Sequence, residues 1–487
     1  MSNKNVSAPS APQGGDLNFT RLVAMIMGST IGAGIFTTAG DMAANGAHSG
    51  AVLIGWGIAG IGMLCLTLCF FGLNKVRPDL TNGVYSYAKE GFGEYVGFNS
   101  AWGYWLSALL CNVSYTTLLF GSLGYFFPVF GEGNNLVSLI CASAVIWLMN
   151  FLVLRGVKEA TFLNIITTVS KLIPLFVFIV AVIFIGAFDI KIFMHNFWGD
   201  GSMSLLDQVK ATTGATVWSF IGVEGAVVLS ARAKKSSDVG KASITGFIGL
   251  LSIYIMVAVL SLGVMPAEEI AQLSNPQMAG ILQAAVGPWG ASLINFGVVL
   301  SLSGALLGWT IIAADCPYSA AQQGVFMKAF AKSNAKGSPS FSLFLTNGII
   351  QAFLIIVYFN ESTYQIFYNM SASMIMIPYL FSALFYLKVT MKKEGQLANY
   401  SAGLLTRERI LAVIGSIYGI WMLYSGGLSY LLITTVLYAL GMIVYILGRK
   451  ERGEKPFKGY EGIIAIAILA LAAISVVMMI NGTLNPF

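Results

Sequence analysis

The chain has 487 residues, of which 56% are hydrophobic and 10% are charged, and its formal net charge is +6 at pH 7. A soluble domain carries roughly 25% charged residues, so this chain cannot present a surface that faces water on all sides. The composition therefore indicates an integral membrane protein. Its apolar runs of about 20 residues favour membrane-spanning helices over the shorter alternating segments of a β-barrel.

The N-terminal segment, residues 1–20, is polar and contains Ser, Pro and Gly. It lacks the basic stretch and short apolar core of a cleaved signal, so we expect a disordered cytoplasmic tail. The runs beyond it predict thirteen spans, near 22–46, 50–74, 97–127, 136–155, 162–187, 211–231, 242–264, 288–314, 342–358, 363–387, 408–426, 428–448 and 462–480.

Basic residues fall on alternate connections between these spans. Lys171, Lys191 and Lys210 are the exceptions among the 27 lysine and arginine residues, and the others lie on one side of the membrane. Because basic loops face the cytoplasm, the pattern predicts a multi-pass membrane protein with its N-terminus inside and its C-terminus outside. The positive charge then faces anionic lipid and does not indicate a nucleic-acid partner.

Two glycine-containing runs interrupt predicted spans. Gly28 to Gly34 contains three glycines inside the first span, and Trp218 to Gly225 lies inside the sixth. Each glycine costs roughly 1 kcal/mol against alanine in a helix interior, so we expect both helices to break. Two interrupted spans in matching halves are typical of a transporter's substrate site. The alternative is that the glycines merely permit close helix packing.

The breaks would expose backbone groups that suit a zwitterion. The N–H groups at Gly32 to Gly34 would attract a carboxylate, and the carbonyl groups near Ile221 and Gly222 would suit an ammonium group. Aromatic residues at similar depth, including Trp218 and Trp309, would contact a cationic side chain, although such residues also serve as ordinary packing.

Two charged residues are predicted inside spans. Glu224 is the only acidic residue well inside one, and we expect it to bind a cationic group, accept a proton or do both. Its alternative role is a structural hydrogen bond between helices. Lys171, in the fifth span, either neutralises a site between helices or extends its amine to the membrane surface.

At these residues the chain resembles the amino acid–polyamine–organocation (APC) superfamily and, within it, the basic amino acid/polyamine antiporters. The motifs that carry the resemblance are Gly32 to Phe36, Ser100 to Trp105 with Cys111-Asn112, Trp218 to Glu224 and Gly308 to Thr310. The runs Arg77 to Leu80, Tyr85 to Ala88 and Leu154 to Ala160 are most similar to bacterial arginine–ornithine and histidine–histamine exchangers.

The resemblance implies an all-α, LeuT-like fold with a five-plus-five inverted repeat, discontinuous helices 1 and 6, and 12–13 spans in total. Residues 21–190 would form the first repeat, residues 205–390 the second, and residues 405–487 additional C-terminal helices. It also implies alternating access and a homodimer. Lys171 is similar to a fifth-span lysine that replaces sodium in proton-linked relatives, so we expect no metal, no cofactor and no sodium dependence.

The resemblance also implies the binding residues. Glu224 matches an acidic, pH-linked gate and Trp309 a gating tryptophan. Ala33 stands where arginine/agmatine exchangers have a serine, which leaves backbone donors to hold the carboxylate. The expected substrate contacts are Thr30, Ile31, Gly32, Ala33, Gly34, Ser107, Ala108, Asn112, Trp218, Phe220, Ile221, Gly222, Glu224, Trp309 and Ser371.

These observations predict a secondary-active transporter. It would exchange a basic amino acid (arginine, lysine or histidine) for ornithine or a decarboxylated amine. A proton-coupled uptake permease is the alternative within transport, and a membrane nutrient sensor is the alternative from another class. The sequence contains no His/Glu metal cluster, nucleophile–base motif or phosphate loop, so we do not expect an enzyme.

Overall fold

The computed structural model describes residues 19–20, 23, 27, 30–80, 84–156, 161–224, 236–360 and 364–484. Most of the predicted tail over residues 1–20 lies outside these ranges, as do Gly28, Ser29 and Gly225 of the two glycine-containing runs. All regular elements in the described ranges are helical, which confirms the all-α class.

Long helices make up most of the described chain. They are α3 (Ser49–Val76), α5 (Glu94–Gly124), α6 (Leu136–Leu154), α7 (Thr161–Phe184), α12 (Ser236–Val264), α15 (Pro288–Gln322), α16 (Ser340–Asn360), α17 (Tyr364–Lys392), α18 (Ala402–Ser425), α19 (Leu428–Glu451) and α20 (Glu461–Ile480). Within the described ranges, nine helices are long and apolar enough to cross a bilayer. The interrupted first and sixth spans, α7 and α18 are not among these nine.

Shorter elements occupy the interrupted spans and several connections. They are η1 (Ala33–Phe36), α2 (Thr38–Ala44), α4 (Val84–Phe92), η2 (Pro128–Phe130), α8 (Ile190–Phe193), α9 (Leu205–Ala211), α10 (Thr213–Phe220), α13 (Ala267–Ile270), α14 (Gln277–Val286), η4 (Lys328–Ala331) and η5 (Gly395–Asn399). The span predicted near 288–314 continues as a helix to Gln322. The helix passes Asp315, whose side chain is exposed, and includes Pro317.

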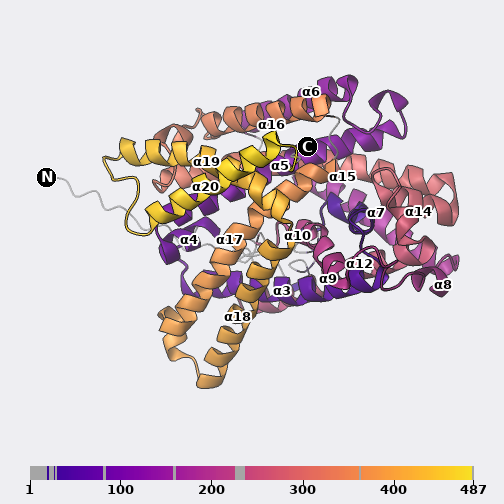
Figure 1. Ribbon diagram of the computed structural model, residues 1–487, viewed down its shortest axis with the longest axis horizontal. Coiled ribbons are helices and arrows are strands. Elements are labelled where there is room, and N and C mark those ends of the chain that lie inside the picture. Colours follow the sequence, from indigo (N-terminus) through magenta and orange to yellow (C-terminus); the bar gives the residue numbers. More distant parts are fainter. Residues whose placement is uncertain are drawn as a thin grey trace.

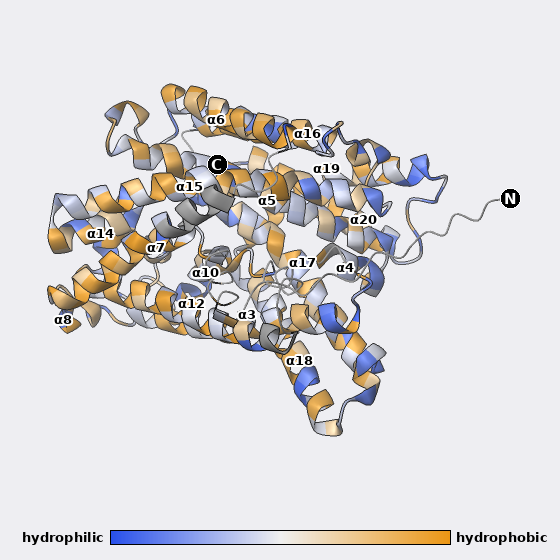
Figure 2. Ribbon diagram, turned by 180° about the vertical axis from the view of Figure 1, so that it is seen from behind, coloured by the Kyte–Doolittle hydropathy of each residue, from blue (hydrophilic) through white to orange (hydrophobic). Residues whose placement is uncertain are grey.

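The arrangement is that of a bundle with two different ends. In Figure 1, α3, α5, α6, α15 and α16 run roughly along the long axis, α8 and α14 lie at one end, and α4 lies at the other. Figure 2 shows hydrophobic residues along the outer helices and hydrophilic residues near α4 and at the connection between α17 and α18. We call the end with α8 and α14, where Glu132 and Glu268 lie, the acidic end. We call the end with α4, where Arg77 and Lys89 lie, the basic end.

Helix α5 forms the centre of this bundle. It packs against α15, α17 and α4, and most of its residues are buried. By contrast, α20 leaves large apolar side chains such as Ile463 and Ile480 exposed, as expected for a helix that faces lipid.

Arg77 organises the basic end between α3 and α4. Its guanidinium donates to Asp79 Oδ2 at 2.7 Å and to Glu90 Oε1 at 3.2 Å. The hydrogen bonds from Arg77 lower the pKa of the Asp79 carboxyl below its ordinary value. The run from Arg77 to Leu80 therefore forms a charged turn that connects two helices.

The C-terminal helix is attached to the start of α5. Glu461 is 4% exposed, and its Oε1 accepts a hydrogen bond from the Tyr95 backbone N–H at 2.9 Å, while its Oε2 accepts from the Lys458 N–H at 2.9 Å. Gly93 precedes α5 with φ +93°, and a Cβ there would lie 3.0 Å from Glu461 Oε1. Glu461 thus acts as an N-terminal cap supplied by another helix.

We expect Glu461→Ala to lower the thermal stability of the detergent-solubilised protein. Loss of a capping carboxylate costs about 1–2 kcal/mol, so the melting temperature of a chain of this length should fall by about 1–2 °C. Glu269→Ala, at an exposed position on α13, is the matched control and should melt like the wild type. Equal melting temperatures for all three proteins would contradict the capping role.

Candidate functional site

The first predicted span is interrupted where the glycines predicted it. Ile31 and Gly32 are not helical, η1 begins at Ala33, and α2 begins at Thr38. Gly32 has the extended conformation φ −91°, ψ −171°. The N–H groups that follow lie at the start of a new helical segment, where they have no acceptor within the helix.

The sixth span is interrupted as well. Helix α10 ends at Phe220, and turns follow through Glu224. Gly222 has φ +98°, a left-handed conformation that favours glycine. The Val223 N–H bonds to the Phe220 carbonyl at 3.1 Å, which closes the turn. Both predicted breaks are therefore confirmed.

The two interrupted spans meet directly. Thr38 Oγ1 and Ser219 Oγ are 3.1 Å apart and form a hydrogen bond between α2 and α10. A Cβ on Gly34 would lie 2.5 Å from Trp218 Cδ1, and one on Gly32 would lie 2.9 Å from the Tyr115 hydroxyl oxygen. A Cβ at Gly34 would therefore overlap the Trp218 ring, whereas one at Gly32 would have to displace the Tyr115 hydroxyl.

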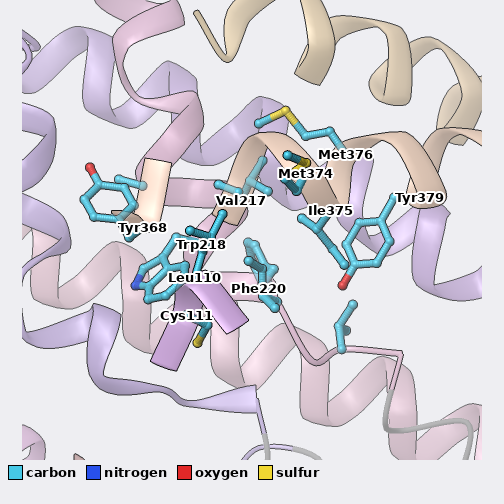
Figure 3. Close-up of a cluster of buried hydrophobic side chains, with 14 of the residues drawn as sticks. Leu110, Cys111, Val217, Trp218, Phe220, Tyr368, Met374, Ile375, Met376 and Tyr379 are labelled. Atoms are coloured by element: carbon cyan, nitrogen blue, oxygen red, sulfur yellow. The ribbon is translucent and has the colours of Figure 1, made fainter. Parts of the chain in front are cut away.

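Trp218 is 5% exposed and lies among aromatic rings. Its ring centroid is 5.5 Å from that of Tyr115 on α5 and 5.6 Å from that of Tyr368 on α17. Figure 3 shows Trp218 beside Tyr368, with Leu110 and Cys111 of α5 close by. The tryptophan thus covers Gly34 and closes the space between three helices.

Glu224 receives hydrogen bonds from two tyrosines. The Tyr104 hydroxyl donates to Oε1 at 2.9 Å, and the Tyr379 hydroxyl donates to Oε2. None of the ion pairs among the described residues includes Glu224. Its carboxylate is therefore stabilised by neutral donors that leave its charge in place.

Lys171 contacts the first break. Its Nζ donates to the Ile31 carbonyl oxygen at 2.6 Å, and the residue is partly buried. A backbone carbonyl at the break thus accepts a hydrogen bond from a lysine of α7. This contact supports an internal role for Lys171 rather than extension of its amine to the membrane surface.

The predicted residues of α5 and α17 also meet. Ser107 Oγ and Ser371 Oγ are 3.0 Å apart, and Ser371 Oγ donates to the Ser107 carbonyl at 2.8 Å. Asn112 Nδ2 donates to the Ala108 carbonyl at 3.3 Å, and Asn112 Oδ1 is buried without a partner. That free acceptor leaves Asn112 able to bind a donor from a ligand.

Among the predicted contacts, Phe220 faces two other helices. The Phe220 ring packs against Trp56, Phe247 and Tyr254, on α3 and α12. The structure therefore does not bring Phe220 to the group formed by Gly34 and Trp218. Trp309 on α15 is partly buried and packs against the main core. Thr30 is buried next to the first break.

Sequence reasoning missed four residues around this group. Tyr115, Tyr368 and Tyr379 gave no signal because one tyrosine among apolar residues is ordinary in a span. Asp41 on α2 is 1% exposed, so Glu224 is not the only carboxylate buried in the bundle. Asp41 lies five residues before the predicted end of its span, where a carboxylate usually reaches water.

Together these groups can hold a zwitterion with a cationic side chain. The start of η1 offers N–H donors for a carboxylate, the turn after α10 offers carbonyl oxygens, Trp218 offers an aromatic face, and Glu224 offers a negative charge. These groups bind and do not react, which fits transport better than catalysis.

Comparisons with known proteins agree with this geometry. The amino acid permease family profile matches residues 17–445. The arginine/ornithine antiporter of Pseudomonas aeruginosa is 44% identical over 478 residues, which cover 96% of this chain and 98% of that protein. The arginine/agmatine antiporters of Chlamydia caviae and Chlamydia abortus are 42% and 40% identical, and each match covers at least 94% of both chains.

The profile covers far more than half of this chain, and the relatives match it over nearly their full length. The chain therefore belongs to the amino acid permease family, whose members are membrane transporters.

Proposed function

We propose that the protein exchanges a basic amino acid for ornithine or a decarboxylated amine across a bacterial cell membrane by alternating access. The observation that carries this proposal is 44% identity, over nearly the full length, to an arginine/ornithine antiporter. The arginine/agmatine antiporters support the same class of cationic substrates.

The geometry of the site supports the proposal. The substrate carboxylate would bind the N–H groups at Gly32 to Gly34, and its ammonium group would bind the carbonyl groups near Ile221 and Gly222. The cationic side chain would lie against Trp218 and toward Glu224. Ser107, Asn112 and Ser371 would contact the substrate from α5 and α17.

The proposal includes an orientation and a repeat structure. The basic end would be cytoplasmic and the acidic end extracellular, with the N-terminus inside and the C-terminus outside. Residues 21–190 and 205–390 would form the two repeats, and residues 405–487 would lie outside them. We also expect a homodimer, which the family resemblance implies.

Counterflow in proteoliposomes tests the exchange. Vesicles are loaded in separate batches with unlabelled ornithine, agmatine, cadaverine or histamine, and uptake of labelled arginine, lysine or histidine is followed. We expect uptake that requires one particular internal partner. Because an empty site would reorient slowly, vesicles without internal substrate should accumulate little label.

Uptake into empty vesicles with acid outside would contradict exchange and establish a proton-coupled permease instead. Binding of a basic amino acid without any uptake would indicate a sensor. Replacing external sodium by choline should leave the exchange rate unchanged, because Lys171 supplies an internal cation.

Glu224→Gln tests the acidic gate. Glutamine imitates the neutral form of the side chain, so the variant should exchange at one rate from about pH 5 to pH 8, equal to the wild-type rate at the pH where Glu224 is protonated. The measurement is counterflow at matched internal and external pH.

Glu408→Gln is the matched control. Glu408 is also buried and accepts a tyrosine hydroxyl, from Tyr386 at 2.8 Å, but lies on α18 away from the site. It should keep the wild-type pH profile. A wild-type profile in Glu224→Gln would overturn the proposed role of that carboxylate.

Lys171→Ala tests the contact with the first break. A hydrogen bond from a charged group contributes about 1.5–3 kcal/mol, so turnover should fall by roughly 10- to 100-fold. Lys191→Ala, which removes an exposed lysine on α8, should exchange at the wild-type rate. Wild-type turnover and melting temperature in Lys171→Ala would instead favour a lysine that only reaches the membrane surface.

A further inference from the structure

Asp41 is a buried carboxylate that the central site does not use. It lies on α2 and is 1% exposed. Its Oδ2 accepts a hydrogen bond from Tyr364, whose hydroxyl also contacts Thr37 Oγ1. Its Oδ1 is buried and has no hydrogen-bond partner. One oxygen of this carboxylate is therefore available.

The groups that face Asp41 are neutral. Tyr364, Tyr368 and Gln365 approach it from α17, and Gln277 approaches it from α14. Asp41 belongs to none of the ion pairs found in the described ranges. An ionised carboxylate at such a depth costs at least a few kcal/mol unless a cation or hydration compensates it.

Other buried polar atoms next to Asp41 also lack partners. They are Gln277 Oε1, on a side chain that is 2% exposed, and the hydroxyl of Tyr368, which is 0% exposed. Gln277 lies directly on α2, since a Cβ on Gly40 would be 2.2 Å from its Cγ. The described side chains around Asp41 offer acceptor oxygens and neutral amide and hydroxyl donors, but no cation. An ammonium group supplies three N–H donors and a guanidinium five.

A row of aromatic rings connects this cluster with the central site. The ring centroids of Trp218 and Tyr368 are 5.6 Å apart, and those of Tyr368 and Tyr364 are 5.3 Å apart. Figure 3 shows the Tyr368 hydroxyl directed away from Trp218. Aromatic faces attract organic cations, so the row can pass a cationic group between Trp218 and Asp41.

The cluster also adjoins a cavity at the acidic end of the bundle. This cavity has a volume of about 690 Å³, and its lining includes Glu132, Asn275 and Pro276. Asn275 Oδ1 accepts a hydrogen bond from Gln365 Nε2 at 2.9 Å, and Gln277 follows Pro276 directly. The amides that face Asp41 thus form the boundary between the cavity and the bundle interior.

We propose that Asp41, Gln277 and Tyr368 form a second binding site, which holds the ammonium or guanidinium end of the substrate between the outer cavity and the central site. The inference rests on the proposed exchange of basic amino acids and on the acidic end being extracellular. Asp41 lies seven residues beyond Gly34, which corresponds to about 10 Å at the rise of an α-helix. It selects cations before the central site binds the whole amino acid.

The test is Asp41→Asn, measured in proteoliposomes of known orientation. We expect the external KM for arginine to rise at least about tenfold, the internal KM to stay the same, and Asp41→Glu to restore the external KM. Inhibition by external citrulline, a neutral analogue of arginine with nearly the same shape, should be equal in wild type and Asp41→Asn. Glu269→Gln, which removes a charge from an exposed position at the same end, should leave all values unchanged.

The outcomes separate the two proposals. If the wild type does not exchange basic amino acids, the proposed function fails. If it does, but Asp41→Asn keeps the external KM or shifts both KM values equally, the outer site is wrong and Asp41 is structural. Sodium-dependent exchange that Asp41→Asn abolishes would assign the carboxylate to a metal cation and also overturn the inference.

Discussion

Backbone polar groups that are freed inside an apolar bundle are the constraint on which the rest of this structure depends. Lipid cannot satisfy them, so each interrupted helix needs donors and acceptors from its neighbours. The Ile31 carbonyl accepts a hydrogen bond from Lys171 of α7. The Ser219 carbonyl accepts one from the Tyr254 hydroxyl of α12 at 2.8 Å. The backbone groups at the breaks are therefore satisfied by side chains of other helices. Any movement of α2 or α10 must break these hydrogen bonds or move the donor side chains with it.

The buried carboxylates follow a second common rule. Glu224 and Asp41 are stabilised by tyrosine hydroxyls, whereas Glu408 also has a cation, Arg407, at 2.7 Å. A hydroxyl lowers the free energy of an anion without cancelling its charge, so the first two remain able to attract a cation or a proton. Because α2 runs toward the acidic end and α10 comes from it, Asp41 and Glu224 lie on opposite sides of Gly34 and Trp218. A cationic substrate in the centre would have a carboxylate on either side.

Much of this organisation could be predicted from the sequence, because it depends on composition along the chain. Glycines in apolar runs located both breaks, because glycine is unfavourable in the interior of a helix. The orientation of single rings was harder to predict. Phe220 follows Trp218 by two residues, which places its side chain about 200° around α10 and against α3 and α12. Asp41 was missed because its burial comes from Gln277 and Tyr364, which are more than 200 residues away in the sequence.

The last helix is attached to the centre of the bundle at one point. Helix α20 faces lipid along most of its length, but Glu461 at its start caps α5, the helix that carries Ser107, Asn112 and Tyr104. Helix α5 is buried on nearly all sides, so tilting it would open contacts with α15 and α17 together. By contrast, η1 and α2 are short, and non-helical residues flank them. In the proposed exchange, α2 and α10 would therefore move against α5 at a lower free-energy cost than α5 itself, whose start is held by the cap from Glu461.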